Sequence, residues 1–228
     1  MSFSGFPTGT LGFLEELSRN NNRDWFTENK TRYQALVQDP ALDFIEAMAP
    51  SLAQLSRYYE AIPRRTGGSL MRVYRDTRFS PDKTPYKTNI GIQFRHAMAK
   101  DVHAPGLYLH IEPGDIFVGV GSWRPDSKAL AKIRTRIAEK PELWRQVIDN
   151  DGFNKQFCLA GDRLQRPPRG YDRDHPMLET LKWKDFIGIK ALTEKTIVSS
   201  RLQRTAASRF SDGFPLIRFL CEALELPV

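Results

Sequence analysis

The segment that decides the fold is GLYLHIEPGDIFVGVGS, residues 106–122. Apolar residues alternate in part with small or polar ones on both sides of its centre, and many of the apolar ones are β-branched or aromatic, which is typical of half-buried β-strands. At the centre lies Pro-Gly-Asp (113–115), where proline presets one turn dihedral and glycine accepts a positive one. The segment therefore predicts an antiparallel hairpin with strands at 107–112 and 115–122.

Two glycines, Gly119 and Gly121, fall on the same face of the second predicted strand. Interior glycines weaken a strand, so this pair indicates a bulge or the close approach of another group. A packed helix or an aromatic side chain is the favoured explanation, and a ligand is the alternative.

Strand-like patterns continue outward from the hairpin. LMRVYR (70–75) and IGIQFRHAM (90–98) are rich in β-branched and aromatic residues, and a further strand is expected at 186–191. Residues 68–122 are thus expected to supply most strands of one mainly antiparallel sheet. No linker interrupts the chain, so residues 1–228 are expected to form a single domain.

Helical spacing of apolar residues dominates the chain on both sides of this region. Before it, the expected features are N-caps at Thr8 or Thr10 and at Asn22, and a helix from Pro40 to about Leu55 that Pro50 can kink or split. After it, they are helices from Asp126 or Ser127, from Pro141, around 177–183 and over about 194–225, with a long loop at 161–176. This order indicates an α+β fold, in which a mainly antiparallel sheet from the central region packs against N- and C-terminal helices.

The composition is that of a globular protein, since 40% of the 228 residues are apolar and 27% are charged. The two cysteines, Cys158 and Cys221, match no metal or redox spacing, which favours a reducing compartment. Neither a signal-peptide pattern nor an apolar run of the ~20 residues that span a bilayer is apparent. The sequence therefore predicts a cytoplasmic protein without a membrane partner.

The net charge of +7 is concentrated in one part of the chain. Residues 64–100 hold nine Lys or Arg and two Asp or Glu, whereas the remainder holds 25 of each kind and is neutral. A concentrated positive charge attracts anions, while a diffuse one mainly affects solubility. A solvated basic face is the alternative explanation of the same charge.

Within this region, RVYRDTRFSPDKTPYKT (72–88) combines five cations, two tyrosines and two aspartates. Prolines at 81 and 85 disfavour regular structure, so the chain is expected to turn and to bring at least three of the five cations together. Arginine forks and lysine ammonium groups suit phosphate or carboxylate, and tyrosines add hydroxyls or a stacking face. The residues predicted to bind an anionic small ligand are Arg72, Tyr74, Arg75, Arg78, Lys83, Tyr86 and Lys87.

Two other interpretations of segment 72–88 stay open. Asp76 and Asp82 could pair with neighbouring arginines and brace the loop, but two carboxylates leave a surplus of three positive charges. The same cations could instead follow the phosphate backbone of a nucleic acid, although no known nucleic-acid-binding motif is present. Cations that converge in a cleft would favour a small ligand, and cations spread over an open face would favour a polymer.

Catalytic residues are less clearly marked, so the sequence leaves open whether the protein is an enzyme. Asp76 and His175 are the acid–base candidates, although Asp-His-Pro before a helix is more often a cap. Scattered histidines and the cysteine spacing predict no bound metal. The alternative metal ligands are His110, Glu112, Asp172, Asp174 and His175. No cofactor is expected, because the sequence contains no phosphate-binding glycine loop and no dinucleotide fingerprint.

Several segments of the chain also resemble a known family. RVYRDTRFSPDKTPYKT is similar to the signature of the family called domain of unknown function 2461. FLEELSRNNNRDWFTENKTRY (13–33), GLYLHIEPGDIFVGVGSWRP (106–125) and GDRLQRPPRGYDRDHP (161–176) look like that family's N-terminal helical motif, central hairpin and later loop. The resemblance spans nearly the whole chain and implies a single domain, but it implies no reaction.

Overall fold

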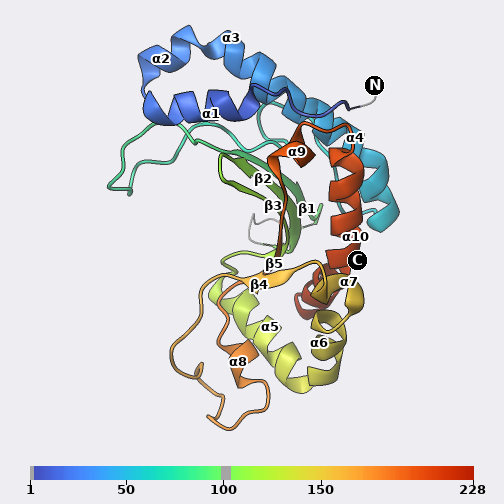
Figure 1. Cartoon of the computed structure of the whole chain (residues 1–228). Helices are drawn as coiled ribbons and strands as arrows, with labels where there is room; N and C mark the ends of the chain where they lie inside the picture. Colours follow the sequence, from blue (N-terminus) through green and yellow to red (C-terminus); the bar gives the residue numbers. More distant parts are fainter. Residues whose placement is uncertain (1–2, 99–103) are drawn as a thin grey trace.

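The computed structural model describes residues 3–98 and 104–228, and within them a five-stranded antiparallel sheet lies at the centre of the molecule (Figure 1). The strand order is β1-β2-β3-β5-β4. The strand bounds are Ile90–Arg95 (β1), Gly106–Glu112 (β2), Asp115–Ser122 (β3), Cys158–Ala160 (β4) and Phe186–Ala191 (β5). Helices precede and follow these strands in the chain, so the predicted α+β class is confirmed.

The helices form one group before the sheet and another after the hairpin. The first group is α1 (Thr10–Arg19), α2 (Arg23–Glu28), α3 (Lys30–Tyr33), the π-helical turn η1 (Gln34–Gln38) and α4 (Asp39–Leu55). The second is α5 (Ser127–Glu139), α6 (Pro141–Ile148), α7 (Asp151–Asn154), α8 (Leu178–Leu181), α9 (Glu194–Ile197) and α10 (Leu202–Ala223). In the part of the chain that is described, no helix combines the length and the apolar character needed to cross a bilayer.

The hairpin forms where the sequence predicts it. β2 and β3 pair in register, with Leu107 opposite Val120 and Glu112 opposite Asp115. Gly114 turns the chain between them with a φ of 81°, the positive dihedral expected of glycine at this turn. β5 also lies at its predicted position and pairs with β3.

The predicted strand at 70–75 is wrong. Within the described residues this segment is extended but makes isolated bridges instead of a ladder, Leu70 with Ile92 and Tyr74 with Tyr86. It changes partner because the chain turns back on itself after residue 76, and the prolines at 81 and 85 donate no backbone hydrogen bond. β1 is also shorter than predicted, and the short β4 was not predicted, because three residues show no periodicity.

Side-chain caps start two of the helices as predicted. Asn22 accepts the N–H of Trp25 at 2.9 Å, and Asp126 accepts the N–H of Ala129 at 2.7 Å. Pro50 lies inside α4 without ending it.

The cap predicted for the first helix is wrong. α1 begins after Gly9 and has no side-chain cap, so neither Thr8 nor Thr10 supplies one. Thr10 is buried as the first residue of the helix, and its hydroxyl donates to the carbonyl of Leu36 at 2.7 Å. This bond satisfies the buried hydroxyl and ties α1 to η1.

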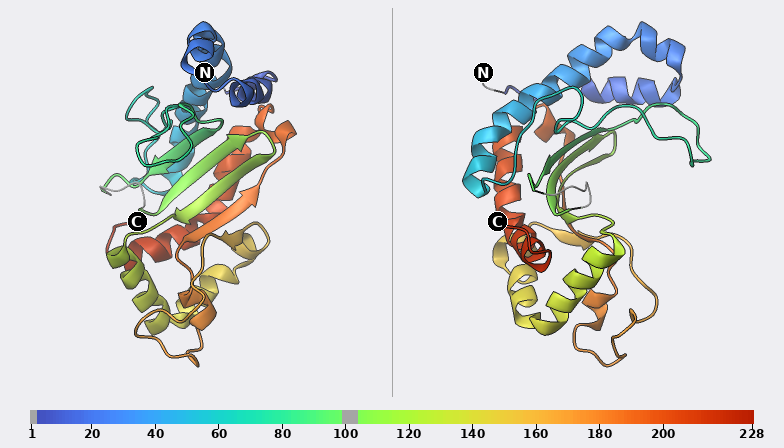
Figure 2. Two further views of the ribbon diagram at one scale, coloured as in Figure 1. Left: turned by 90° about the vertical axis from the view of Figure 1, so that its left-hand side faces the viewer. Right: turned by 180° about the vertical axis from the view of Figure 1, so that it is seen from behind.

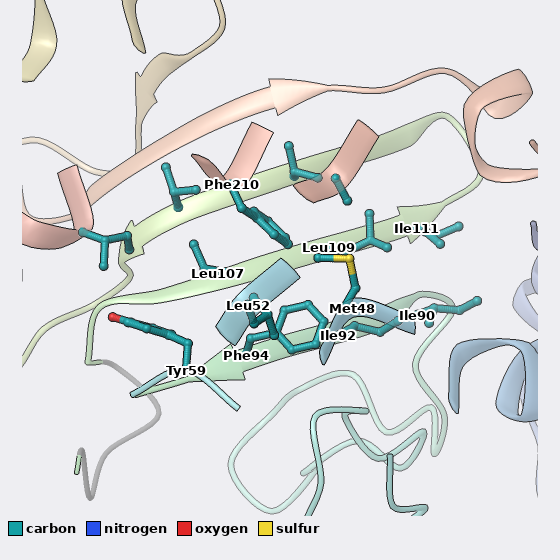
Figure 3. Close-up of a cluster of buried hydrophobic side chains, with 14 of the residues drawn as sticks. Met48, Leu52, Tyr59, Ile90, Ile92, Phe94, Leu107, Leu109, Ile111 and Phe210 are labelled. Carbon is teal, nitrogen blue, oxygen red and sulfur yellow. The ribbon is translucent and has the colours of Figure 1, made fainter. Parts of the chain in front are cut away.

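α4 and α10 cover one face of the sheet (Figures 1 and 2). Met48 and Leu52 of α4 and Phe210 of α10 lie over a layer of strand side chains (Figure 3). That layer contains Ile90, Ile92, Phe94, Leu107, Leu109 and Ile111. Each of these buried side chains stabilises the fold by about 1.5–3 kcal/mol.

The opposite face of the sheet is crossed by no helix of the described residues (Figure 2, left). Strand residues that point to this face, such as Tyr108, His110 and Phe117, are half-buried, whereas their neighbours in the strand are buried. Segment 72–88 runs past the end of this face that lies nearest α1 (Figure 1). Polar groups of the segment and of the sheet can therefore meet there.

Candidate functional site

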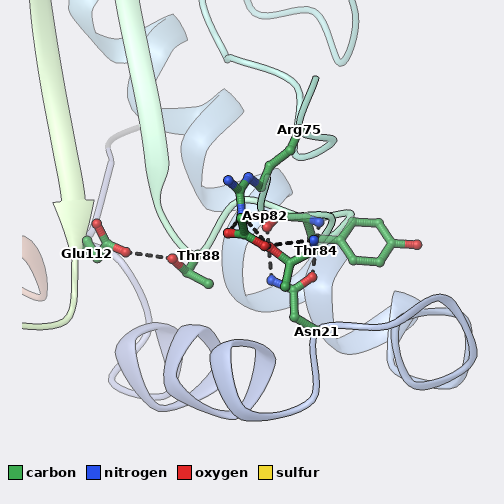
Figure 4. A network of polar contacts seen from close by, with 7 residues as sticks. Asn21, Arg75, Asp82, Thr84, Thr88 and Glu112 are labelled. Carbon is green, nitrogen blue, oxygen red and sulfur yellow. Dashed lines mark hydrogen bonds and ion pairs between the residues drawn. The ribbon is translucent and has the colours of Figure 1, made fainter. Parts of the chain in front are cut away.

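Segment 72–88 is fastened to the turn between α1 and α2 by the side chain of Asn21 (Figure 4). The Asn21 amide donates to the carbonyl of Tyr86 at 2.9 Å and accepts its N–H at 3.0 Å. The Tyr86 ring is 4% exposed and stacks on Phe26 with 4.0 Å between ring centroids, and Tyr74 leans on it from the outside. The Tyr86 ring is therefore part of the core, although it was predicted as a ligand contact, and its backbone anchors the segment.

Arg75 braces the segment internally. Its guanidinium donates to the carboxylate of Asp82 and to the hydroxyl of Thr84 (Figure 4). Asp82 also accepts the N–H of Thr84 at 2.9 Å. The hydrogen bond from Arg75 is the main reason that the pKa of Asp82 is lowered to about 2. The ion pair is therefore intact at neutral pH.

A second ion pair forms at the exposed tip of the segment. Arg78 donates to both oxygens of Asp76, at 3.0 and 2.7 Å, and these bonds lower the pKa of Asp76 to about 2. Lys83 donates to the carbonyl of Thr77 at 2.8 Å. Asp76, an acid–base candidate from the sequence, is thus an ionised carboxylate held by an arginine.

A pocket of about 410 Å³ opens between the base of the segment, α1 and the start of β1. It is lined by Ser18, Asn21, Arg75, Asp82, Thr84, Tyr86, Lys87, Thr88 and Asn89. Two of the five predicted cations, Arg75 and Lys87, reach this pocket, whereas Arg72, Arg78 and Lys83 are not among its lining residues.

Lys87, like Arg75, is a half-buried cation of the pocket. Its pKa is lowered, first by burial and second by the positive charge of Arg72. Within the described residues, neither Lys87 nor Arg72 has a hydrogen bond or an ion pair to a carboxylate. The two aspartates of the segment are engaged by Arg75 and Arg78. An ammonium group in such surroundings lacks the counter-charge that would offset its desolvation.

A polar network on the open sheet face lies against this pocket. The hydroxyl of Tyr108 lies 3.1 Å from Nδ1 of His110, and Nε2 of His110 lies 3.4 Å from Glu112. Burial raises the pKa of Tyr108 to about 12, so the phenol keeps its proton. A carboxylate can only accept, so the neutral imidazole turns its N–H toward Glu112, and Nδ1 accepts from the hydroxyl of Tyr108.

Thr88 and Asn89 join this network to the pocket. Thr88 donates its hydroxyl proton to Glu112 at 2.6 Å (Figure 4), and the amide nitrogen of Asn89 lies 3.4 Å from Nδ1 of His110. Sequence reasoning missed both residues because their side chains carry no charge. The alternation of the predicted strand at 107–112 does place His110 and Glu112 on one face, and Tyr108 with them.

His175 belongs to the loop before α8. This loop lies below the sheet in Figure 1, away from segment 72–88. Its Nδ1 accepts the N–H of Met177 at 3.0 Å, and its carbonyl accepts the N–H of Leu178 at 2.9 Å. The structure thus does not bring His175 together with Asp76. In the described part of the chain, no three His, Cys, Asp or Glu side chains are grouped as metal ligands.

Another hollow, of about 550 Å³, lies between α4, α6 and α10. Its walls are largely apolar and include Leu143, Phe214 and Phe219. Its charged lining residues are Arg218 and Glu222, and Glu222 pairs with Arg136. This hollow lacks a group of converging cations and polar groups, so the pocket at Lys87 is the candidate site.

Comparison with known proteins gives one match. The family model described as "Conserved hypothetical protein (DUF2461)" matches residues 9–219. No curated protein and no solved structure matches the chain.

Proposed function

The chain belongs to the DUF2461 family of conserved hypothetical proteins, and since this membership assigns no activity, we propose from its geometry that it binds a phosphorylated or similarly anionic small ligand at Lys87. The observation that carries the proposal is a half-buried ammonium group without a carboxylate partner in the described residues, in a pocket and close to Arg72. Like charges in partly water-excluded surroundings repel each other, and an anion in the pocket beside Lys87 offsets that cost.

The surroundings of Lys87 suit a small anion. Arg75 lines the same pocket as a fixed donor, because Asp82 and Thr84 hold its guanidinium in place. Thr88 and Asn89 add neutral polar groups that are held by the sheet. A charge-assisted hydrogen bond contributes about 1.5–3 kcal/mol, which corresponds to about tenfold or more in affinity.

Calorimetric titration tests the proposal with inorganic phosphate, glycerol 3-phosphate and sulfate in chloride buffer. We expect the wild type to bind at least one phosphate-bearing ligand, and Lys87→Met to weaken that binding about tenfold or more. Lys83→Met is the matched control, because it removes the same charge from the same segment outside the pocket. The proposal fails if no anion binds, or if both substitutions weaken binding equally.

The proposal concerns binding and not a reaction. The two acid–base candidates do not meet, since Asp76 is held by Arg78 at the tip of the segment and His175 lies in the loop before α8. If chemistry takes place at this pocket, other residues carry it.

A second candidate function, binding of single-stranded nucleic acid, is supported by the tip of the segment. Phe79 is 94% exposed, Arg78 lies 5.9 Å from its ring centroid, and Tyr74 is 55% exposed. Exposed aromatic rings beside cations are what stacked bases and phosphates require. Fluorescence anisotropy with a labelled oligonucleotide tests this function. Phe79→Ala should weaken the binding about tenfold or more, while Lys87→Met leaves most of it.

A further inference from the structure

The pocket at Lys87 contains neutral polar side chains whose donors are already used by the protein. The hydroxyl of Ser18 donates to the carbonyl of Glu15 at 2.8 Å. The hydroxyl of Thr88 donates to Glu112 at 2.6 Å. A hydroxyl has one proton to donate and two lone pairs to accept with, so both oxygens retain acceptor capacity only.

Asn89 also offers a hydrogen-bond acceptor to the pocket. Since Tyr108 donates to Nδ1 of His110, this nitrogen is an acceptor, and Asn89 must present its NH₂ group to it at 3.4 Å. The carbonyl oxygen Oδ1 of Asn89 is then the free end of the amide, and within the described residues it has no partner. The tautomer of His110 thus determines which end of the Asn89 amide is available to a ligand.

The pocket therefore presents a cation on one side and hydrogen-bond acceptors on the other. Lys87 supplies the positive charge, since the charge of Arg75 is offset by Asp82, which also lines the pocket, and Ser18, Thr88 and Asn89 supply lone pairs. A ligand that satisfies both needs an anionic group and, a few ångströms away, hydroxyl groups that donate. Further anionic oxygens would face these lone pairs and be repelled, which disfavours pyrophosphate and other polyanions.

We propose that the ligand of this pocket is a hydroxylated phosphate monoester, that is, the phosphate of a sugar or polyol. This inference rests on the proposed function and specifies its substrate class. The phosphate lies against Lys87, and the hydroxyl groups of the ligand donate to Ser18, Thr88 and Asn89.

Calorimetric titration with phosphate esters of equal charge tests the inference. Glycerol 3-phosphate and ribose 5-phosphate carry hydroxyl groups, whereas propyl phosphate carries the same phosphate without them. We expect the hydroxylated esters to bind the wild type about tenfold more tightly than propyl phosphate, and pyrophosphate to bind less tightly than either hydroxylated ester. Equal affinity for glycerol 3-phosphate and propyl phosphate would overturn the inference and leave the proposed function standing.

Variants distinguish the contribution of the cation Lys87 from that of the hydrogen-bond acceptors. Thr88→Val removes a hydroxyl at constant shape and should reduce the preference for hydroxylated esters severalfold, with propyl phosphate unaffected. Ser18→Ala should reduce the same preference severalfold, and because Ser18 is exposed, this variant is expected to fold like the wild type. Lys87→Met should weaken all esters alike, and Thr27→Val, on the exposed side of α2, should change nothing. If both pocket substitutions leave the preference intact, the inference is wrong, and if no ester binds the wild type, the proposed function fails with it.

Discussion

Burial and the positive charge of Arg72 both lower the pKa of Lys87, so folding disfavours its ammonium form. In the absence of an anion, Lys87→Met should therefore raise the free energy of unfolding by a few tenths to about 1 kcal/mol. The methionine keeps the packing of the lysine stem and removes the charge. Urea unfolding in phosphate-free buffer measures this difference. Lys83→Met, at an exposed site of the same segment, loses a hydrogen bond to the carbonyl of Thr77 and should show no such increase.

The extra stability of Lys87→Met should depend on pH in a definite direction. The ordinary pKa of the lysine is 10.5 and the folded-state value lies below it. The cost of the wild-type ammonium is therefore present in full at neutral pH and disappears as the pH rises toward about 10.5. The advantage of Lys87→Met should shrink over the same alkaline range. A variant less stable than the wild type at neutral pH would instead identify the ammonium as a structural group.

Asp82 titrates at the other end of the pH scale. The hydrogen bond from Arg75 lowers its pKa from 3.8 to about 2. Its contribution to stability is present above about pH 4 and is lost as the pH falls from there toward 2. The difference in Tm between the wild type and Asp82→Asn should thus be constant near neutrality and narrow below about pH 4. Calorimetric scans measure it, and a difference that persists unchanged at pH 2 would show that the ion pair is not its source.

The sequence predicts the cations of the site but not their partners. Counting charges in segment 72–88 shows a surplus of three, and the structure has three cations, Arg72, Lys83 and Lys87, without a carboxylate partner in the described residues. Which of them is half-buried depends on how the segment turns and where Asn21 anchors it, and neither follows from local sequence. Neutral groups such as Asn89 carry no signal, because their role depends on a hydrogen bond to another strand.

The pairing of β3 with β5 depends on one glycine. Gly121 has a φ of +125°, and a Cβ atom there would lie 2.0 Å from the carbonyl oxygen of Phe186. Gly121→Ala should therefore destabilise the protein by about 2 kcal/mol or more. Gly119→Ala, on the same face of the same strand, is the control, since its Cβ would meet neighbours at 3.8 Å and beyond. Thermal unfolding compares the two, and equal Tm values would contradict the prediction.

The elements that the sequence predicts well are those whose signal is local. The hairpin at 106–122 follows from alternation and a turn, and the start of α5 follows from one capping residue, Asp126. The predicted strand at 70–75 has residues typical of strands, but a ladder also needs one continuous partner strand. This segment bridges β1 at Leu70 and then, at Tyr74, bridges Tyr86 of the same loop. Residues Cys158–Ala160 become a strand because β5 lies beside them. Such pairings are set by tertiary contacts.

α10 belongs to the second group of helices and connects it with the first group. It packs against α4 on one side and against α5 and α6 on the other, and it covers β3 between them. We therefore expect one cooperative unfolding transition, as a single domain requires. Leu14→Ala in α1 and Ile137→Ala in α5 remove buried side chains from the two groups, and each should cost about 2–5 kcal/mol.

Calorimetry and far-UV circular dichroism measure the number of unfolding transitions and their Tm values. Both substitutions should lower the Tm of the same single transition. If each variant lowers the Tm of only part of the unfolding signal and leaves the other part unchanged, the chain consists of two separately stable units. The single-domain prediction would then be wrong.

The strand order has a consequence for the chain while it is being synthesised. β1, β2 and β3 are adjacent in sequence and can pair as soon as they leave the ribosome, but β3 gains its other neighbour, β5, only after Phe186 has been added. At ~5–20 residues per second this interval lasts several seconds, during which the edge of β3 is open. α4 precedes the strands and covers the side of β1, but α10, which covers β3, is made later still. The nascent protein therefore presents an unpaired strand edge beside an uncovered apolar surface, a combination that chaperones bind and that aggregates when they are scarce.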